Sequence, residues 1–177
     1  MYPVIRFALE MLRARRMPPL AMGETHVTSI RCWPWDIDAQ MEMNNGRALT
    51  LFDIGRVSMF LRMGVLGEMS RRKWFGTIAG STVRYRRRIT LFQRLELRSR
   101  VIGADARFTY IEQGFWRGDD CCAHAVLRAA ITTGQGIIPS QEVPDAFGYC
   151  MDDMELPDWV LSWDAAEAKR PWPPMQS

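Results

Sequence analysis

The most pronounced pattern along the chain is an apolar stretch between Asn44 and Met63 that covers nearly the whole circumference of a predicted helix. A helix that is apolar on every side is buried, whereas a surface helix shows one apolar stripe. Asn44 or Asn45 suits the N-cap position, and Gly64 favours termination. The apolar positions are Ala48, Leu49, Leu51, Phe52, Ile54, Val57, Met59, Phe60, Leu61 and Met63.

Apolar and polar residues alternate in several later segments, and this period of two predicts strands. Short turns at Gly103–Asp105 and Gly118–Asp120 connect consecutive strands, which favours an antiparallel meander. One buried helix with one-sided strands is an α+β pattern, and a sheet curled around the helix satisfies both. The predicted strands are residues 26–33, 77–90, 95–102, 107–116 and 121–133.

Both ends of the chain carry further predicted helices. Residues 1–16 are amphipathic, and Arg6 and Glu10 interrupt the apolar run, which argues against a secretory signal peptide. We favour a helix packed on the domain, with contact at a membrane surface as the alternative. The tail predicts a helical turn over residues 140–147 and a helix over residues 157–169. We expect one domain over residues 1–177, with a helical extension over 1–20 and a helical tail over 139–177.

The composition is that of a globular protein. With 47% hydrophobic and 24% charged residues, the chain can bury a sizeable core. The net charge of +3 gives no strong field, so no nucleic-acid partner is expected. Four cysteines without a Cys-x-x-Cys spacing favour a reduced, cytoplasmic protein. No apolar stretch approaches the ~20 residues that span a bilayer.

Two carboxylates, Asp36 and Asp38, precede the start of the predicted central helix. The first turn of a helix has unpaired backbone N–H groups and roughly half a positive charge, which favours a carbonyl oxygen on which negative charge develops. An acid beside that helix end could activate water against the same carbonyl. Transfer of an acyl group to water requires such an arrangement.

These acids, the Met43–Arg47 turn and the Phe52–Arg56 segment resemble the hotdog-fold acyl-CoA thioesterases, in particular the 4-hydroxybenzoyl-CoA thioesterase-like branch of the thioesterase-like superfamily. The resemblance extends from about His26 to about Gly136. It implies a hotdog fold, in which an antiparallel curved sheet wraps around one long central helix. It also implies hydrolysis of an acyl-CoA or similar acyl thioester, with coenzyme A as part of the substrate and no separate cofactor. A homodimer or a dimer of dimers, with sites at the subunit boundary, is implied as well.

Asp38 is the first catalytic candidate, because the second acid of the Asp-x-Asp pair is the general base or nucleophile in the thioesterases that the chain resembles. The alternative is a loop residue that makes turn and capping hydrogen bonds. Asp53 is the second candidate, since another hotdog branch places its catalytic acid on this helix. An ionised carboxylate inside an apolar helix needs a partner, and we favour an ion pair with Arg56 as the role of Asp53.

Asn44, Asn45 and Gly46 are candidate substrate-binding residues at the helix start. Gly46 allows a ligand to approach closely, and its N–H could polarise a carbonyl. An asparagine N-cap is compatible with that role. Where the family pattern has His before Met-Asn-Asn, this chain has Glu42, which weakens any mechanism based on an imidazole. We expect Glu42 to be a solvated loop residue, with replacement of the lost acid/base as the alternative.

Arginines form the last group of candidates. Arg84, Arg86 and Arg88 belong to one predicted strand face, and Arg94, Arg98 and Arg100 belong to a face of the next strand. If the two strands pair, they form a basic patch suited to the phosphates of coenzyme A. On that basis Arg84 and Arg86 are substrate-binding candidates. The alternative is a solvated face balanced by neighbouring acids.

We therefore predict a thioester hydrolase with an apolar slot for the acyl chain beside Leu49 and Phe52. Cys122 and His124 share a predicted strand face, but two ligands are too few for a zinc site, so no metal is expected. The alternative from another class is a non-catalytic acyl- or lipid-binding protein that keeps the slot without turnover. Glu42 in place of the family histidine makes this alternative credible.

Overall fold

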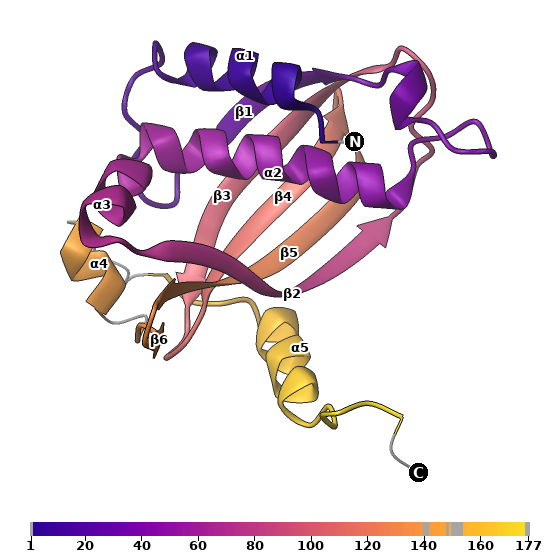
Figure 1. The fold of residues 1–177 in the computed structure, drawn as a ribbon. Coiled ribbons are helices and arrows are strands. Elements are labelled where there is room, and N and C mark those ends of the chain that lie inside the picture. The colour runs from indigo at the N-terminus through magenta and orange to yellow at the C-terminus, as the bar shows by residue number, and fades with distance from the viewer. Residues whose placement is uncertain (1, 140–141, 148, 150–153, 176–177) are drawn as a thin grey trace.

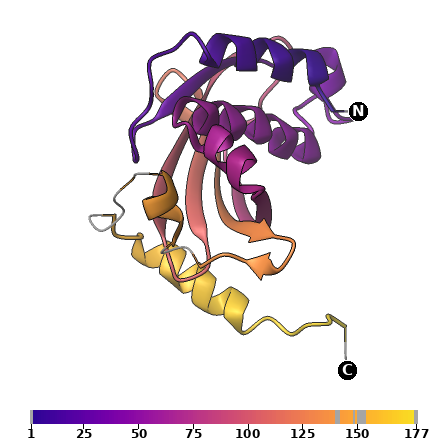
Figure 2. The same ribbon diagram turned by 60° about the vertical axis from the view of Figure 1, so that its left-hand side comes forward.

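The computed structural model describes residues 2–139, 142–147, 149 and 154–175. A six-stranded antiparallel sheet curves around one central helix, as the sequence predicts (Figure 1). Helices α1 and α2 lie on one side of the sheet, and α5 lies on the other (Figure 2). The helices are α1 (Val4–Ala14), α2 (Asn45–Arg62), α3 (Val65–Arg72), α4 (Glu142–Phe147) and α5 (Asp158–Ala168), with a 3₁₀ helix, η1 (Pro34–Asp36). The strands are β1 (His26–Arg31), β2 (Phe75–Tyr85), β3 (Arg94–Ala104), β4 (Thr109–Arg117), β5 (Asp120–Thr133) and β6 (Gly136–Ile137).

Helix α2 lies on the concave side of the sheet and holds the core together (Figure 1). Phe52 is fully buried and stacks on Phe115 of β4, with ring centroids 4.5 Å apart. Gly55 lets the helix approach β3 closely, because a Cβ atom at this position would lie 2.6 Å from Cδ2 of Leu97. The predicted burial of this helix is therefore confirmed.

The ends of α2 also agree with the sequence. Oδ1 of Asn44 accepts a hydrogen bond from the backbone N–H of Arg47 at 3.1 Å, which makes Asn44 the N-cap. Gly64 takes a φ of 75°, a left-handed conformation that glycine adopts readily at the end of a helix. Helix α3 follows directly and was not predicted, because its eight residues are too few to show a clear helical period.

The sheet order is β1-β3-β4-β5-β2, with β6 paired to β5. The predicted meander is confirmed for β3, β4 and β5. The pairing on which the basic patch depends does not occur, because β2 pairs with β5 and β3 pairs with β1. Residues 86–93 do not join β2 to β3 as a tight hairpin. Instead, the carbonyl of Ile89 accepts from the N–H of Met43, and that of Cys32 accepts from the N–H of Phe92.

The predicted basic patch is therefore wrong. Arg84 lies in β2, whereas Arg98 and Arg100 lie in β3, with β4 and β5 between these two strands. Arg98 pairs with Glu96 (Nη2–Oε2, 2.8 Å) and Arg100 pairs with Glu112 (Nη2–Oε2, 2.6 Å). For these two arginines the alternative of a solvated face balanced by acids is confirmed.

The predicted helices near both ends of the chain are present, as α1, α4 and α5. Residues 140–141 of the predicted tail turn lie outside the described residues. Helix α5 packs on the outer face of the sheet, where Val160 is fully buried and Nη1 of Arg128 lies 2.9 Å from Oδ1 of Asp164. Within the described part of the chain, no helix has the length and hydropathy needed to cross a membrane.

Candidate active site

One side of α2 extends from an open hollow at the start of the helix to an apolar cavity beside its second half. Gly46, Thr50, Asp53 and Val57 are spaced by four, three and four residues, so they form one stripe along the helix. Gly46 and Thr50 line an open hollow at the helix start. Val57 lines an apolar cavity beside the second half of the helix. Asp53 therefore lies on the stripe between the two.

The hollow at the helix start has a volume of about 440 Å³ and contains two of the predicted binding residues, Asn44 and Gly46. Among the described residues, the N–H groups of Asn45 and Gly46 have no acceptor, whereas that of Arg47 is capped by Asn44. The free amides are the groups available to a carbonyl oxygen at this end of the helix. The other residues that line the hollow are Tyr2, Trp35, Ile37, Arg47 and Thr50.

Of the two acids that precede α2, Asp36 is a structural anchor. Its side chain is fully buried, and Oδ2 accepts from Nη1 of Arg6 at 2.7 Å and from the N–H of Trp33 at 3.0 Å. Its Oδ1 lies 3.2 Å from Nε of Arg47. Asp36 thereby ties α1 to the first turn of α2.

Asp38 lies in a turn just before the helix. Its Oδ1 accepts from the N–H of Gln40 at 2.8 Å, and its own N–H donates to the carbonyl of Glu42 at 2.9 Å. These are turn hydrogen bonds of the kind that the sequence offers as the alternative role. Ile37 lines the hollow at the helix start, but Asp38 does not. The catalytic role of Asp38 stays a prediction.

Asp53 forms the ion pair with Arg56 that the sequence favours (Oδ1 with Nη2). The Asp53 side chain is 39% exposed, whereas that of Arg56 is 9% exposed. Nη1 of Arg56 donates to Oε1 of Gln113 at 3.1 Å, and Nε2 of Gln113 donates to the carbonyl of Phe52 at 2.9 Å. Burial lowers the pKa of Arg56, and the charge of Asp53 opposes that shift. The carboxylate is thus held in one orientation at a water-accessible position.

Tyr2 lines the hollow at the helix start and is affected by the charge of Asp53. Burial raises the pKa of Tyr2, and the negative charge of Asp53 raises it further. The phenol therefore lies within electrostatic range of Asp53 while it also lines the hollow. Sequence reasoning missed Tyr2 and Gln113, because neither lies in a motif and both act through residues distant along the chain.

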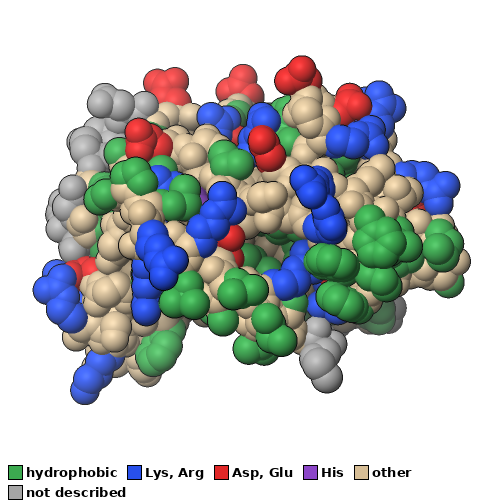
Figure 3. Space-filling view, turned by 90° about the horizontal axis from the view of Figure 1, so that it is seen from above, with side chains coloured by type: hydrophobic (Ala, Val, Ile, Leu, Met, Phe, Trp, Pro, Cys, Tyr) green, Lys and Arg blue, Asp and Glu red, His purple; other side chains and the backbone are tan. Residues whose placement is uncertain are grey.

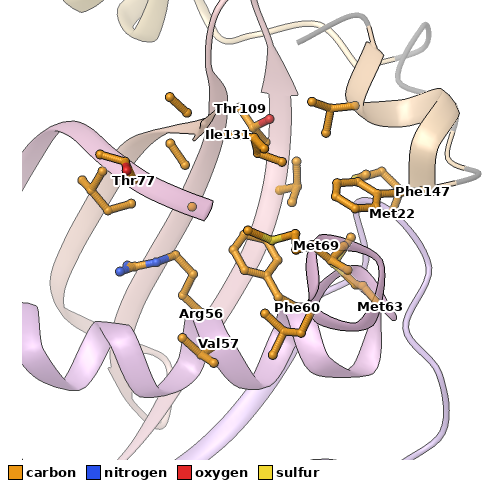
Figure 4. Close-up of a pocket in the computed structure, with 18 residues that line it drawn as sticks. Met22, Arg56, Val57, Phe60, Met63, Met69, Thr77, Thr109, Ile131 and Phe147 are labelled. Atoms are coloured by element: carbon orange, nitrogen blue, oxygen red, sulfur yellow. The ribbon is translucent and has the colours of Figure 1, made fainter. Parts of the chain in front are cut away.

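An apolar cavity of about 250 Å³ lies between the second half of α2 and the sheet. Arg56, Val57 and Phe60 line it from α2, and the Arg56 side chain reaches from the helix toward β2 (Figure 4). The remaining lining comes mainly from α3, α4, the start of β2 and the inner face of the sheet. The slot expected beside Leu49 and Phe52 is therefore misplaced, since Phe52 is fully buried in the core and the cavity begins at Arg56.

A second hollow of about 220 Å³ flanks the helix start on the side of β2. It contains Asn45 together with Arg86, which lies just beyond the end of β2. Glu42 also lines it and is paired with Arg88 (Nε to Oε2, 2.8 Å), so it is not a free acid in place of the family histidine. Arg84 faces His124 across β2 and β5 and lines neither hollow.

Cys122 and His124 have separate surroundings. Cys122 is fully buried in the core beside α2, whereas Nε2 of His124 lies 2.9 Å from Oε1 of Glu112. Among the described residues, no group of three His, Cys, Asp or Glu side chains is placed to hold a metal ion.

The fold and the acid-bearing central helix define a hotdog protein, and the family follows from the sequence. Residues 32–163 match the Thioesterase-like superfamily, and the chain belongs to it. Protein THEM6 from Xenopus laevis is 32% identical over 163 residues, which cover 90% of this chain and 77% of that protein. Protein THEM6 from Danio rerio is 33% identical over 92 residues, which cover 52% of this chain and 46% of that protein.

Solved structures confirm the hotdog fold. The probable thioesterase YbaW from Escherichia coli superposes with a TM-score of 0.64 at 16% identity, over 68% of this chain and 94% of that one. A 1,4-dihydroxy-2-naphthoyl-CoA thioesterase from Synechocystis superposes with a TM-score of 0.61 at 11% identity, over 76% of this chain and all (100%) of that one. At such identities the likeness establishes the fold alone.

Proposed function

We propose that the protein hydrolyses an acyl thioester, such as an acyl-CoA, along the α2 stripe of Gly46, Thr50, Asp53 and Val57. The observation that carries the proposal is the position of Asp53, on one side of the helix between free backbone amides and an apolar cavity. Membership of the thioesterase-like superfamily supports it, as does the description of solved neighbours as thioesterases.

The cavity accommodates the acyl group. A dry cavity of about 150 Å³ holds a benzene ring, so about 250 Å³ suffices for an aromatic ring or a short aliphatic chain.

Asp53 takes a proton from water as the water oxygen attacks the carbonyl carbon. The tetrahedral intermediate collapses, the C–S bond breaks, and the departing sulfur receives the proton. The products are a carboxylic acid and a free thiol.

The general base is one of two aspartates, and the geometry favours Asp53. Its carboxylate is fixed by Arg56, and Arg56 itself lines the cavity. Asp38 uses one carboxylate oxygen to cap Gln40 and lines neither the hollow at the helix start nor the cavity. We retain Asp38 as the competing assignment.

The spacing along α2 favours a second copy of the chain at the site, as in the homodimer or dimer of dimers that we propose. Gly46 and Asp53 are seven residues apart, which is about 10 Å along a helix. A base and an oxyanion donor each lie about 3 Å from the atoms that they serve. Within one protomer, the Asp53 carboxylate, the water, the carbonyl group and the Gly46 N–H would have to lie almost on one line. A second copy facing the stripe removes this requirement, because it can supply one of the two groups.

The coenzyme A portion would lie toward the hollow that contains Asn45 and Arg86. A guanidinium group binds phosphate oxygens in pairs, and the Arg86 side chain has no carboxylate partner among the described residues. Arg84 is the weaker of the two predicted binding residues, because it lines neither hollow.

The test measures hydrolysis by the purified protein across a panel of aromatic and aliphatic acyl-CoA thioesters, with Asp53→Asn and Asp38→Asn as a matched pair. We expect Asp53→Asn to lower kcat by about 10²–10⁴-fold, and Asp38→Asn to change it little. A large loss in Asp38→Asn alone would transfer the role of base to Asp38. If the wild type binds acyl-CoA without turning it over, the non-catalytic acyl-binding alternative is correct.

A further inference from the structure

Helix α1 exposes its apolar side to solvent. Ile5, Leu9 and Leu12 are four and three residues apart, so they form one stripe, and they are 77%, 62% and 52% exposed. Val4 lies at the start of the same helix and is 64% exposed. A helix on a globular domain normally turns such a stripe toward the core.

The inward side of α1 carries hydrogen-bonded polar side chains beside the apolar Phe7 and Ala14. Nη1 and Nη2 of Arg6 donate to Asp36 at 2.7 Å and to the carbonyl of Arg31 at 3.0 Å. Glu10 is buried, and its Oε1 accepts from Oγ1 of Thr28 at 3.0 Å. Rotation of the helix to bury the apolar stripe would break these bonds and leave buried polar groups unpaired. The outward apolar stripe is therefore a property of the folded state.

A basic hollow of about 380 Å³ adjoins this stripe. Leu9 belongs to both, and the hollow is also lined by one acid, Glu10, and by Arg6, Arg13, Arg31 and Arg94. Arg6 is paired with Asp36 and Nη1 of Arg13 lies 3.7 Å from Oε2 of Glu10, which leaves Arg31 and Arg94 for an anion. Arg31 and Arg94 face each other across β1 and β3, and neither has a carboxylate partner in the described part of the chain. Like charges in direct cross-strand positions are unfavourable, and a bound anion between them removes that penalty.

Aromatic side chains border the same hollow. Trp33 lines it and stacks on Trp35, with ring centroids 5.6 Å apart, and Phe92 contacts Trp33 edge-on at 6.0 Å. Trp35 and Phe92 are 62% and 53% exposed. Seen from the side on which α1 lies, hydrophobic and basic side chains are interspersed, and the acidic side chains lie mostly along one border (Figure 3).

We propose that this surface docks the protein on an anionic phospholipid bilayer. The stripe of Ile5, Leu9 and Leu12 would enter the boundary between headgroups and acyl chains, and Arg31 and Arg94 would contact the lipid phosphates. Tryptophan is typical of this depth, because its ring is apolar and its N–H is polar. A second copy of the chain fits less well, since a two-fold contact here would bring the same unpaired arginines together.

The experiment is co-sedimentation of the purified protein with vesicles made of equal parts phosphatidylcholine and phosphatidylglycerol, or of phosphatidylcholine alone. Leu9→Glu tests the apolar stripe, and the double variant Arg31→Gln, Arg94→Gln tests the hollow. Leu161→Glu is the matched control, because Leu161 is exposed to a similar extent (50%) on α5, away from α1. Circular dichroism confirms that each variant folds.

The wild type and Leu161→Glu should bind the anionic vesicles and fail to bind phosphatidylcholine alone. Leu9→Glu should weaken binding at least tenfold, on the order of the loss of one buried leucine. The arginine pair should weaken it about 25-fold, since each basic residue at an anionic surface contributes about fivefold. The proposal is overturned if the wild type does not bind anionic vesicles, if Leu161→Glu loses as much binding as Leu9→Glu, or if Leu9→Glu changes only the oligomeric state.

Discussion

At the scale of single residues, the contact between α2 and β3 depends on one missing side chain. An added Cβ at Gly55 would lie 2.6 Å from Cδ2 of Leu97 and 2.8 Å from Oγ of Ser99. Gly55→Ala should therefore lower the free energy of unfolding by about 1–3 kcal/mol, the usual effect of overpacking a core. Chemical denaturation measures this change.

Gly67→Ala in α3 is the matched control for this prediction. A Cβ at Gly67 would meet nothing within 4 Å. Alanine is favoured over glycine inside a helix by about 0.5–1 kcal/mol, so this variant should be as stable as the wild type or more so. Equal destabilisation by both substitutions would show that the close approach at Gly55 is unimportant.

Asp36 and Asp38 show why the sequence locates the candidate site but does not assign its residues. Two acids two positions apart are equivalent in a motif, yet Asp36 is buried with Arg6 and Asp38 caps a turn. The partner of Asp36 is 30 residues away in the chain, and no local pattern reports such a distance. The Asp53–Arg56 pair could be predicted because its partners are three residues apart on one helix.

At the scale of elements, α1 is attached to β1 by a buried polar network. Nη1 of Arg62 lies 3.0 Å from Nδ1 of His26, so Nδ1 accepts and the ring proton resides on Nε2. Nε2 then donates to Oγ1 of Thr28 at 2.9 Å, and Thr28 donates to Glu10 at 3.0 Å. Each group is satisfied only while His26 is neutral.

This network makes stability depend on pH. Burial, with the charges of Arg62 and Arg13, lowers the pKa of His26 from 6.5 to about 4. Between these values the unfolded chain binds a proton that the folded state does not, so the free energy of unfolding should fall by about 3 kcal/mol as the pH drops from 6.5 to 4. Burial raises the pKa of Glu10. As the pH falls, the folded state therefore binds a proton at Glu10 before the unfolded chain does, and this offsets part of the fall in the free energy of unfolding.

Denaturation at several pH values tests this dependence, with His26→Gln as the variant. His26→Gln should be less stable at neutral pH and should show a shallower decline toward pH 4. Val160→Ala is the control, because it loses buried packing on α5 without changing a titratable group. An unchanged slope in His26→Gln would place the pH dependence elsewhere.

The sequence predicts an element fully only where the signals for it are local. Helix α2 carries its own N-cap, its stop and an apolar circumference, so its span is readable within twenty residues. The amphipathic period of α1 also predicts a helix, but not its orientation, because Thr28 and Asp36 determine which side faces inward. The separation of β2 from β3 is equally non-local, since it depends on bonds from residues 86–93 to Cys32 and Met43.

At the scale of the whole molecule, β2 is an eleven-residue strand at one edge of the sheet. Its first residues, including Thr77 and Ile78, also line the cavity. A long open edge is a template for pairing with another strand, and a second copy paired here would lie beside the cavity. The proposed dimer and the proposed turnover therefore depend on the same edge.

Lysines on this edge should separate the copies. Ala79 and Ser81 are exposed on β2 and do not line the cavity, so Ala79→Lys with Ser81→Lys adds charge without filling it. Light scattering after size exclusion should show a dimer for the wild type and a monomer for this variant, with thioester turnover lost in parallel. The matched pair Ser162→Lys and Ala165→Lys, exposed on α5, should leave both properties unchanged. A wild-type monomer that turns over thioesters would contradict this prediction. It would show that one protomer supplies both the base and the oxyanion donor, with the reacting groups arranged almost linearly along α2.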